Sequence, residues 1–250
     1  MSGHNKWSTI KRKKGANDAK RGAIFTKLIR EITVAVKNGG EDLNSNPRLR
    51  TAVAKARENN MPMDNIERAI LKASGKMEGV VYEEMRYEGY GPGGVALMVD
   101  VITDNKNRTH PEIRTIFGKN GGNLGESGCV GFMFDRKGMI IIDPDQTDED
   151  TVMELTVDYD IEDIKVNDDN SITIITSPES FNDVNDLITS KSFSTSFNEI
   201  TFIPQTTVDL DEKKAEQCMR LVELLEDHDD IQNVYGNYEI SDEIMEKIQS

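Results

Sequence analysis

The first third of the chain repeats apolar residues every three or four positions, the spacing of amphipathic helices. A first helix is predicted from about Asn17, which suits an N-cap, to the glycines at 39–40. A second is predicted from Pro47, behind Asn46, and a third from Asp64, with a glutamate three residues later as in a capping box. Alanine-rich contacts predict a small three-helix bundle with a thin core.

After residue 76 the pattern changes to short strands alternating with helices. Residues 82–88 and 95–103 are predicted strands on either side of a glycine-rich hairpin turn. Thr109, with a glutamate three residues later, predicts the start of a helix. Near the end of the chain, residues 212–225 predict a helix and 231–235 a strand, before a short C-terminal helix.

Residues 130–203 carry a pattern of their own. Two strands are predicted at 130–134 and 139–142, joined through Arg136-Lys137-Gly138. The elements predicted after them are a helix at 149–157, strands at 161–166 and 172–176, a helix at 178–189 and a strand at 199–203. This order is close to βαββαβ, the split motif of ferredoxin-like domains.

Length and composition narrow the class of protein. At 250 residues the chain exceeds a typical domain of about 150, so two or three domains are expected. The longest apolar runs, 95–99 and 139–142, are far shorter than a membrane span, and the N-terminus lacks the apolar region of a secretory signal. Cys129 and Cys218 are too few for a disulfide framework or a zinc site. We expect a cytoplasmic protein with no membrane partner.

Charge divides the chain into two unlike parts. Residues 1–76 carry 17 Lys/Arg against 7 Asp/Glu, whereas residues 77–250 carry 13 against 38. An overall charge of −15 therefore conceals a strongly basic N-terminal module, which is typical of a protein that binds a polyanion. The acidic remainder favours docking through the N-terminal face alone.

The cations of the first helix, Lys20, Lys27, Arg30 and Lys37, fall on a face away from its apolar stripe, so we expect an open phosphate-binding surface. Trp7 stacks on a base or anchors the N-terminal arm. The predicted nucleic-acid-binding residues are Lys6, Trp7, Lys11, Arg12, Lys13, Lys14, Lys20, Arg21, Lys27, Arg30, Lys37, Arg48, Arg50, Lys55 and Arg57.

Other site chemistry is weaker. The glycine-rich stretches at 89–94 and 118–128 lack the Gly-Lys-Ser/Thr of a P-loop and precede no helix in the dinucleotide-binding manner. The acidic run near Asp158 lacks the glycine of a calcium loop, and the three histidines are too far apart for a zinc motif. No nucleophile–base motif is evident. We therefore predict no catalytic residue, no metal site and no cofactor.

Several long strings in order resemble the YebC family. They include residues 3–11 (Gly-His-Asn-Lys-Trp-Ser-Thr-Ile-Lys), Tyr87-Glu-Gly-Tyr-Gly-Pro-Gly-Gly94, Thr103-Asp-Asn-Lys-Asn-Arg-Thr109 and Lys119-Asn-Gly-Gly-Asn-Leu-Gly125. The chain departs from the family pattern at Arg12, Ala23 and Met63. The resemblance implies an α+β fold: an N-terminal three-helix domain (1–77), a discontinuous α/β domain (78–130 plus 205–250) and an inserted ferredoxin-like domain (131–204).

The family is described as DNA-binding transcriptional regulators, and some members as ribosome-associated translation activators that act at proline runs. The resemblance thus implies a nucleic-acid-binding regulator of gene expression, with the transcription machinery or the ribosome as partner. We expect a DNA-binding, non-enzymatic monomer. The alternatives are a translation activator that binds ribosomal RNA, and a small-ligand binder or enzyme that uses the glycine loops. A third helix with only Arg68 and Lys72 as cations favours binding to the backbone rather than to bases.

Overall fold

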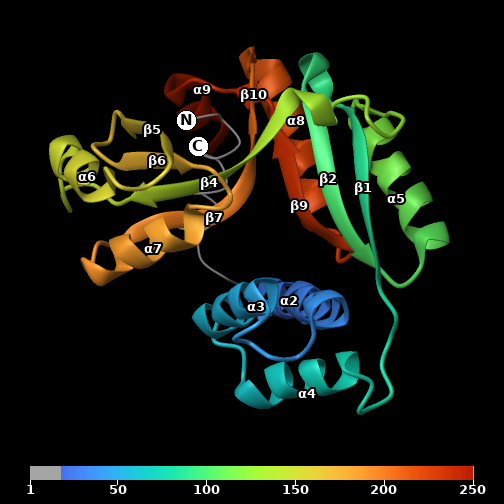
Figure 1. Ribbon diagram of the computed structural model, residues 1–250. Helices are drawn as coiled ribbons and strands as arrows, with labels where there is room; N and C mark the ends of the chain where they lie inside the picture. Colours follow the sequence, from blue (N-terminus) through green and yellow to red (C-terminus); the bar gives the residue numbers. More distant parts are fainter. Residues whose placement is uncertain (1–17, 250) are drawn as a thin grey trace. The chain divides into compact units, whose positions relative to one another are not determined.

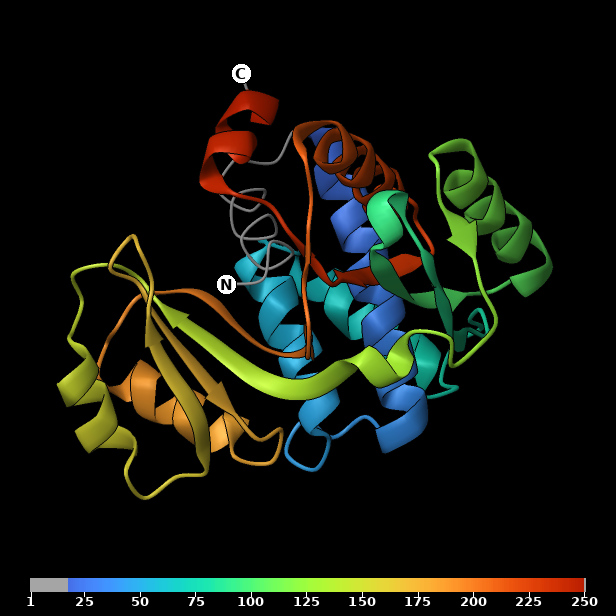
Figure 2. The same cartoon turned by 90° about the horizontal axis from the view of Figure 1, so that it is seen from above.

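The computed structural model describes residues 18–249, and these divide into two compact units. The larger unit contains the residues up to Gly131, then Leu210–Gly236 and the segment from Asp242 onward. The smaller unit contains Phe132–Asp209 and Asn237–Ser241. Mixed helix and sheet confirm the predicted fold class, with a helical region first and sheets after it (Figures 1 and 2). The finer division into three domains stays a prediction.

The larger unit begins with three helices and continues into a four-stranded sheet of order β3-β1-β2-β9. Its elements are α2 (Asp18–Gly39), α3 (Pro47–Glu58), α4 (Met63–Ala73), β1 (Glu83–Tyr90), η1 (Pro92–Gly94), β2 (Ala96–Thr103), α5 (Lys106–Lys119), β3 (Asn123–Leu124), α8 (Glu212–Glu226), β9 (Ile231–Gly236) and α9 (Asp242–Gln249). A short 3-10 turn, η2 (Gly131–Met133), leads out of it.

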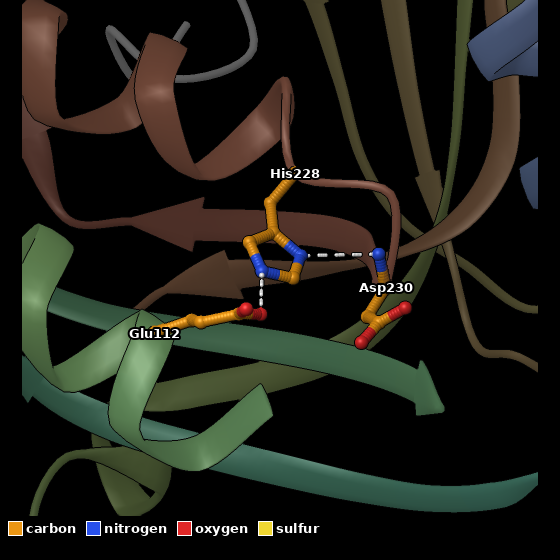
Figure 3. Close-up of side chains that lie close together, drawn as sticks. All are labelled: Glu112, His228 and Asp230. Carbon is orange, nitrogen blue, oxygen red and sulfur yellow. Dashed lines mark hydrogen bonds and ion pairs between the residues drawn. The ribbon is translucent and has the colours of Figure 1, made fainter. Parts of the chain in front are cut away.

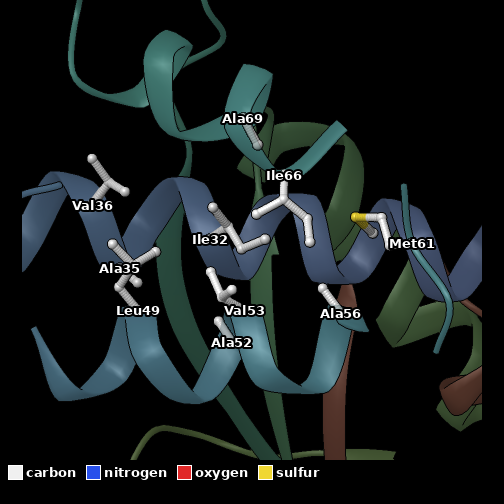
Figure 4. Packing of buried hydrophobic residues seen from close by; sticks show 10 residues of the cluster. All are labelled: Ile32, Ala35, Val36, Leu49, Ala52, Val53, Ala56, Met61, Ile66 and Ala69. Carbon is white, nitrogen blue, oxygen red and sulfur yellow. The ribbon is translucent and has the colours of Figure 1, made fainter. Parts of the chain in front are cut away.

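The three helices α2, α3 and α4, here called the helical module, share one apolar core (Figure 4). Ile32 of α2, Leu49 of α3 and Ile66 of α4 are all fully buried in it. Burying each such side chain contributes about 1.5–3 kcal/mol. In α3 the buried positions are 49, 52, 53 and 56, as the helical period requires. Four of the other seven buried residues are alanines, and larger side chains such as Phe25, Leu28 and Ile29 pack against the core from its edge.

Asn46 joins the end of α2 to the start of α3. Its side-chain oxygen accepts a hydrogen bond from the Leu49 N–H at 3.0 Å, which caps α3 as predicted. Its amide nitrogen donates to the carbonyls of Ala35 (2.8 Å) and Gly40 (2.7 Å), near the C-terminus of α2. Asn46 is buried, so all three bonds are shielded from water.

Two predicted helix starts are wrong. α5 begins at Lys106 because Asn105 caps it and accepts from the Arg108 N–H at 3.2 Å, while the hydroxyl of Thr109 is used elsewhere. α4 begins at Met63 with Pro62 at the N-cap, so Asp64 lies in the first turn and forms no capping box. The predicted N-cap Asn17 lies outside the described residues.

The central strand of the larger sheet, β2, is buried along almost its whole length. Leu97 and Val99, predicted for one face, are completely buried, and Met98 and Ile102 on the other face are buried as well. β2 pairs with β1 on one side and β9 on the other, both antiparallel. Strands buried on both faces form the rigid platform from which the neighbouring loops and helices project.

The smaller unit confirms the predicted βαββαβ order, and its sheet has the order β5-β6-β4-β7 with antiparallel neighbours. Its core is isoleucine-rich, with Ile140, Ile142 and Ile174 all buried. Its elements are β4 (Phe134–Ile142), α6 (Glu149–Thr156), β5 (Ile161–Val166), β6 (Ile172–Thr176), α7 (Phe181–Ser190), β7 (Thr195–Pro204), β8 (Val208–Asp209) and β10 (Tyr238–Glu239).

The strand predicted at 130–134 is wrong except at Phe134, because Gly131–Met133 form the 3-10 turn η2. The strand predicted at 139–142 begins earlier, at Phe134, and continues without a break to Ile142 as β4. Arg136 and Lys137, taken as a turn, pair with β7 in regular register. Gly138 is needed inside the strand because a Cβ there would lie only 2.8 Å from the Cβ of Phe181 on α7. The glycine that suggested a turn is therefore a site of close packing.

Substitutions at Asn46 can distinguish its role as the N-cap of α3 from its hydrogen bonds to the carbonyls of α2. Asn46→Asp keeps a good N-cap but replaces two donated hydrogen bonds with a charge beside two carbonyls. We expect both Asn46→Asp and Asn46→Ala to lower the free energy of unfolding by about 2 kcal/mol, measured by urea denaturation. Asn44→Asp, at an exposed position of the loop before α3, is the control. Wild-type stability in Asn46→Asp would show that capping alone matters.

Candidate nucleic-acid interface

The predicted nucleic-acid-binding residues fall into three groups in the structure. Lys6, Trp7, Lys11, Arg12, Lys13 and Lys14 lie outside the described residues. Lys20 and Arg21 belong to α2, and their side chains are outside the described part. The third group, Lys27, Arg30, Lys37, Arg48, Arg50, Lys55 and Arg57, has described side chains.

Exposed cations of the third group gather on α3. Arg50 and Arg57 are exposed on the same face, two turns or about 10.5 Å apart along the helix axis, with the small exposed Ala54 between them. Arg50 donates to the loop carbonyls of Leu43 (2.9 Å) and Asn44 (3.3 Å), and its other guanidinium N–H groups have no partner among the described side chains and backbone. We call Arg50, Ala54 and Arg57 the α3 face.

One other cation of the helical module, Arg48, is already paired with carboxylates. Arg48 binds Glu31 at 2.7 Å and Glu84 at 2.5 Å, and Asn38 adds a 3.0 Å hydrogen bond to Glu84. The Arg48 guanidinium holds the pKa of Glu84 below its usual value. Lys55 is half-buried, whereas Lys37 is exposed and forms no ion pair with residues 22–241 or 243–248. The module is thus less uniformly cationic than its sequence indicates.

The expected open cationic face along α2 is wrong at two positions. Arg30 is 11% exposed and binds the carboxylate of Asp230 at 2.7 Å, and it also donates to the Asp229 carbonyl. Lys27 donates to the carbonyl of Glu226, at the end of α8, at 2.5 Å. Helical periodicity places these cations away from the apolar stripe, but it does not show the partner about 200 residues further along the chain.

Asp230 lies at the centre of the contacts that join α2, α5 and the segment before β9, which we call the Asp230 junction. No pattern in the sequence indicated it. Its carboxylate is 3% exposed and accepts from Arg30 of α2 and from Arg108 of α5 (2.9 Å). The hydroxyls of Thr103 (3.0 Å) and Thr109 (2.5 Å) complete its shell. Burial alone would raise the pKa of Asp230, but the Thr109, Arg108, Arg30 and Thr103 contacts outweigh it and lower the pKa to about 2.

Beside the junction, three potential metal ligands approach one another: Glu112, His228 and Asp230 (Figure 3). Their lone pairs are already engaged. The Nδ1 of His228 accepts the Asp230 backbone N–H at 3.1 Å, so Nε2 carries the proton and donates to Glu112 at 3.0 Å. Asp230 is bound by two arginines. This donor set does not suit a metal ion, because neither imidazole nitrogen is free to coordinate one.

A groove of about 740 Å³ opens next to the same cluster. Two arginines, Arg30 and Arg108, line it together with four carboxylates. The carboxylates belong to Glu112, Asp227, Asp229 and Asp230. Acidic groups outnumber cations, so the groove itself does not favour a phosphate group.

The glycine loops were the alternative site for an anion, and at the end of the 118–128 stretch the backbone donors are already used. The buried carboxylate of Glu88 accepts from the N–H groups of Gly128 (2.9 Å), Val130 (2.8 Å) and Gly131 (2.7 Å). Burial tends to raise the pKa of Glu88, yet these three donors hold it below its usual value. A side chain of the protein therefore occupies the place that a phosphate would take.

The Asp230 junction predicts a specific acid dependence. A carboxylate with a lowered pKa contributes stability above its unfolded-state pKa of about 4 and loses it as the pH falls toward 2, an effect of about 2 kcal/mol. Asp230→Asn should lower the free energy of unfolding by about 3 kcal/mol at pH 7, because it leaves two arginines without their buried partner. The deficit should shrink below pH 4.

Urea denaturation of the wild type and of Asp230→Asn at pH 7, 5, 4 and 3 measures the difference in their free energies of unfolding. Asp229→Asn removes the same charge from an exposed neighbouring side chain, and it should match wild type throughout. An equal deficit at every pH would mean that Asp230 contributes through packing rather than charge.

The sequence of the chain matches models of a known protein family. Residues 5–76 match the model of the TACO1/YebC protein N-terminal domain, and residues 82–238 match that of the TACO1/YebC second and third domain. Proteins named "probable transcriptional regulatory protein" from Syntrophobacter fumaroxidans and Trichlorobacter lovleyi are 55% and 57% identical over 99% of this chain and 100% of their own length.

A crystal structure of a conserved hypothetical protein from Aquifex aeolicus superposes with a TM-score of 0.80 at 44% identity. It covers 91% of this chain and 94% of that one, so the two share the same fold. Across residues 18–249, no helix combines the length and the hydropathy that crossing a bilayer requires. The resemblance seen in the sequence is confirmed, and the chain belongs to the TACO1/YebC family.

Proposed function

We propose that this protein is a nucleic-acid-binding regulator of gene expression and that its helical module contacts the sugar–phosphate backbone. The observation that carries the proposal is the separation of charge, with 17 Lys/Arg against 7 Asp/Glu in residues 1–76 and 13 against 38 in the rest. Cations that neutralise phosphates release condensed counterions, which drives binding. The names of the relatives support a role in transcription and DNA as the first target.

The described part of the module supplies the α3 face for this contact. Arg50 and Arg57 project from a helix whose opposite side is packed in the core, so their backbones are held rigidly. The small side chain of Ala54 leaves room for a phosphate chain to approach between them. The N-terminal segment adds Lys6, Lys11, Arg12, Lys13 and Lys14 to the same polypeptide.

A ribosome-associated role in translation is the second candidate, and one observation favours it. A helix-turn-helix reader packs two helices together so that one of them enters the major groove. Here α3 and α4 flank α2 on different sides, and each packs on α2 more extensively than on the other (Figure 4). Such a module suits recognition of backbone and shape, which ribosomal RNA offers as readily as DNA.

The α3 face should contribute about two phosphate contacts. Arg50→Gln combined with Arg57→Gln is expected to weaken binding to a 30-base-pair DNA duplex and to reduce the slope of log K against log salt by about 2. Fluorescence anisotropy over a salt series measures both. Lys213→Gln combined with Arg220→Gln on α8 changes the net charge equally and should bind as wild type. An equal loss of affinity in the two double variants would mean that overall charge, and not the α3 face, determines binding.

The basic run at 11–14 is expected to contribute more. Replacing Lys11, Arg12, Lys13 and Lys14 by Glu should abolish measurable duplex binding near 0.15 M salt, because four attractive contacts become repulsive. The same anisotropy titration checks it. Unchanged affinity would remove this segment from the interface.

The choice between DNA and ribosome needs a direct comparison. The protein is sedimented with ribosomes and, in parallel, titrated with its own promoter DNA and with random DNA across a salt series. Promoter binding that survives excess random DNA supports transcriptional regulation. Ribosome association without promoter preference supports the translation role, and neither result would refute the proposal as a whole.

A further inference from the structure

We propose that α5 carries a second nucleic-acid contact surface, formed by Lys106, His110 and Arg114, which binds the phosphodiester backbone of the same molecule that the helical module holds. This inference rests on the proposed function and extends it to the α/β part of the larger unit. We call these three residues the α5 stripe.

α5 is a basic exception within an acidic sequence. Its 14 residues carry the cations Lys106, Arg108, Arg114 and Lys119 and a single acid, Glu112. The segment in which it lies, residues 77–250, has 13 Lys/Arg against 38 Asp/Glu. A polyanion approaching this region would be repelled by most of its surface and attracted at α5.

The charged side chains of α5 divide between two faces. Arg108 points to the junction and binds Asp230 at 2.9 Å. Glu112 points to it as well and bonds to His228 at 3.0 Å (Figure 3). Contact with the imidazole keeps the single carboxylate of α5 away from the other face. The stripe is therefore free of acidic groups from its own helix.

The α5 stripe is exposed and regularly spaced. Its three residues follow one another at four-residue intervals, so they lie about 6 Å apart along the helix on successive turns. Lys106 is 62% exposed and only 3.8 Å from Glu83, a weak surface pair, and His110 makes an edge contact with the Tyr87 ring. Arg114 is exposed and has no ion pair with the described side chains of residues 22–241 and 243–248. Ile113 and Phe117, both fully buried, anchor α5 to the rest of the larger unit.

The junction explains why α5 and the helical module would hold one molecule. Arg30 of α2 and Arg108 of α5 bind the same carboxylate, so the two helices are neighbours held by a buried ionic cluster. A nucleic-acid backbone bound at the helical module can therefore continue to α5 within the same unit. Complementary charge at both places favours a nucleic acid over a protein partner.

The test compares two variants that each remove two positive charges from the full chain. Lys106→Gln with Arg114→Gln removes the cations of the α5 stripe, and Lys213→Gln with Arg220→Gln removes exposed cations from the acidic helix α8 of the same unit. Binding is followed by anisotropy with a 30-base-pair and a 10-base-pair DNA duplex over a salt series.

We expect the α5 variant to bind the long duplex at least threefold more weakly, with a salt slope lower by about 2, and the α8 variant to match wild type. The short duplex should be affected less, because it cannot reach both surfaces. If wild type binds and the Arg50/Arg57 variant is impaired while the α5 variant is not, the α5 contact is refuted and the proposed function stands. If wild type binds neither DNA nor ribosomes, both fall together.

Discussion

The larger unit depends on a single buried carboxylate, that of Asp230, which joins the helical module to the sheet. A charge at 3% exposure must be matched by partners of opposite charge or by several hydrogen bonds, and this one has both. Two of its partners are arginines from different helices, Arg30 and Arg108, and two are threonine hydroxyls. The cations that join the helical module to the sheet are for that reason unavailable to an external phosphate.

This arrangement changes how the charge separation of the chain should be understood. Some basic residues of the helical module bind acids of the α/β part, as Arg30 and Arg48 do, and so serve architecture. Others, such as Arg57, stay exposed and support contact with a polyanion. The proposed interface is therefore narrower on α2 than the sequence indicates. It depends more on α3, on the N-terminal segment and, by inference, on α5.

Local chemistry made much of the fold predictable. The cap at Asn46, the period of buried positions in α3 and the βαββαβ order of the smaller unit all follow from short-range pattern. The errors arose where a distant contact overrides the local signal. Gly138 reads as a turn but accommodates Phe181, and Thr109 reads as a cap but binds Asp230. The partners of Arg30 and Glu88 could not be predicted, because they depend on tertiary placement.

The pairing of β4 with β7 has a thermodynamic consequence for the rest of the molecule. Phe134 lies opposite Pro204, so the chain leaves the smaller sheet beside the point where it enters. Once that sheet has formed, the larger unit closes a connection of a few residues instead of about 70, which spares about 2–3 kcal/mol of loop-closure entropy. The smaller unit thus stabilises the larger unit through chain connectivity. Unfolding the smaller unit would lower the free energy of unfolding of the larger one.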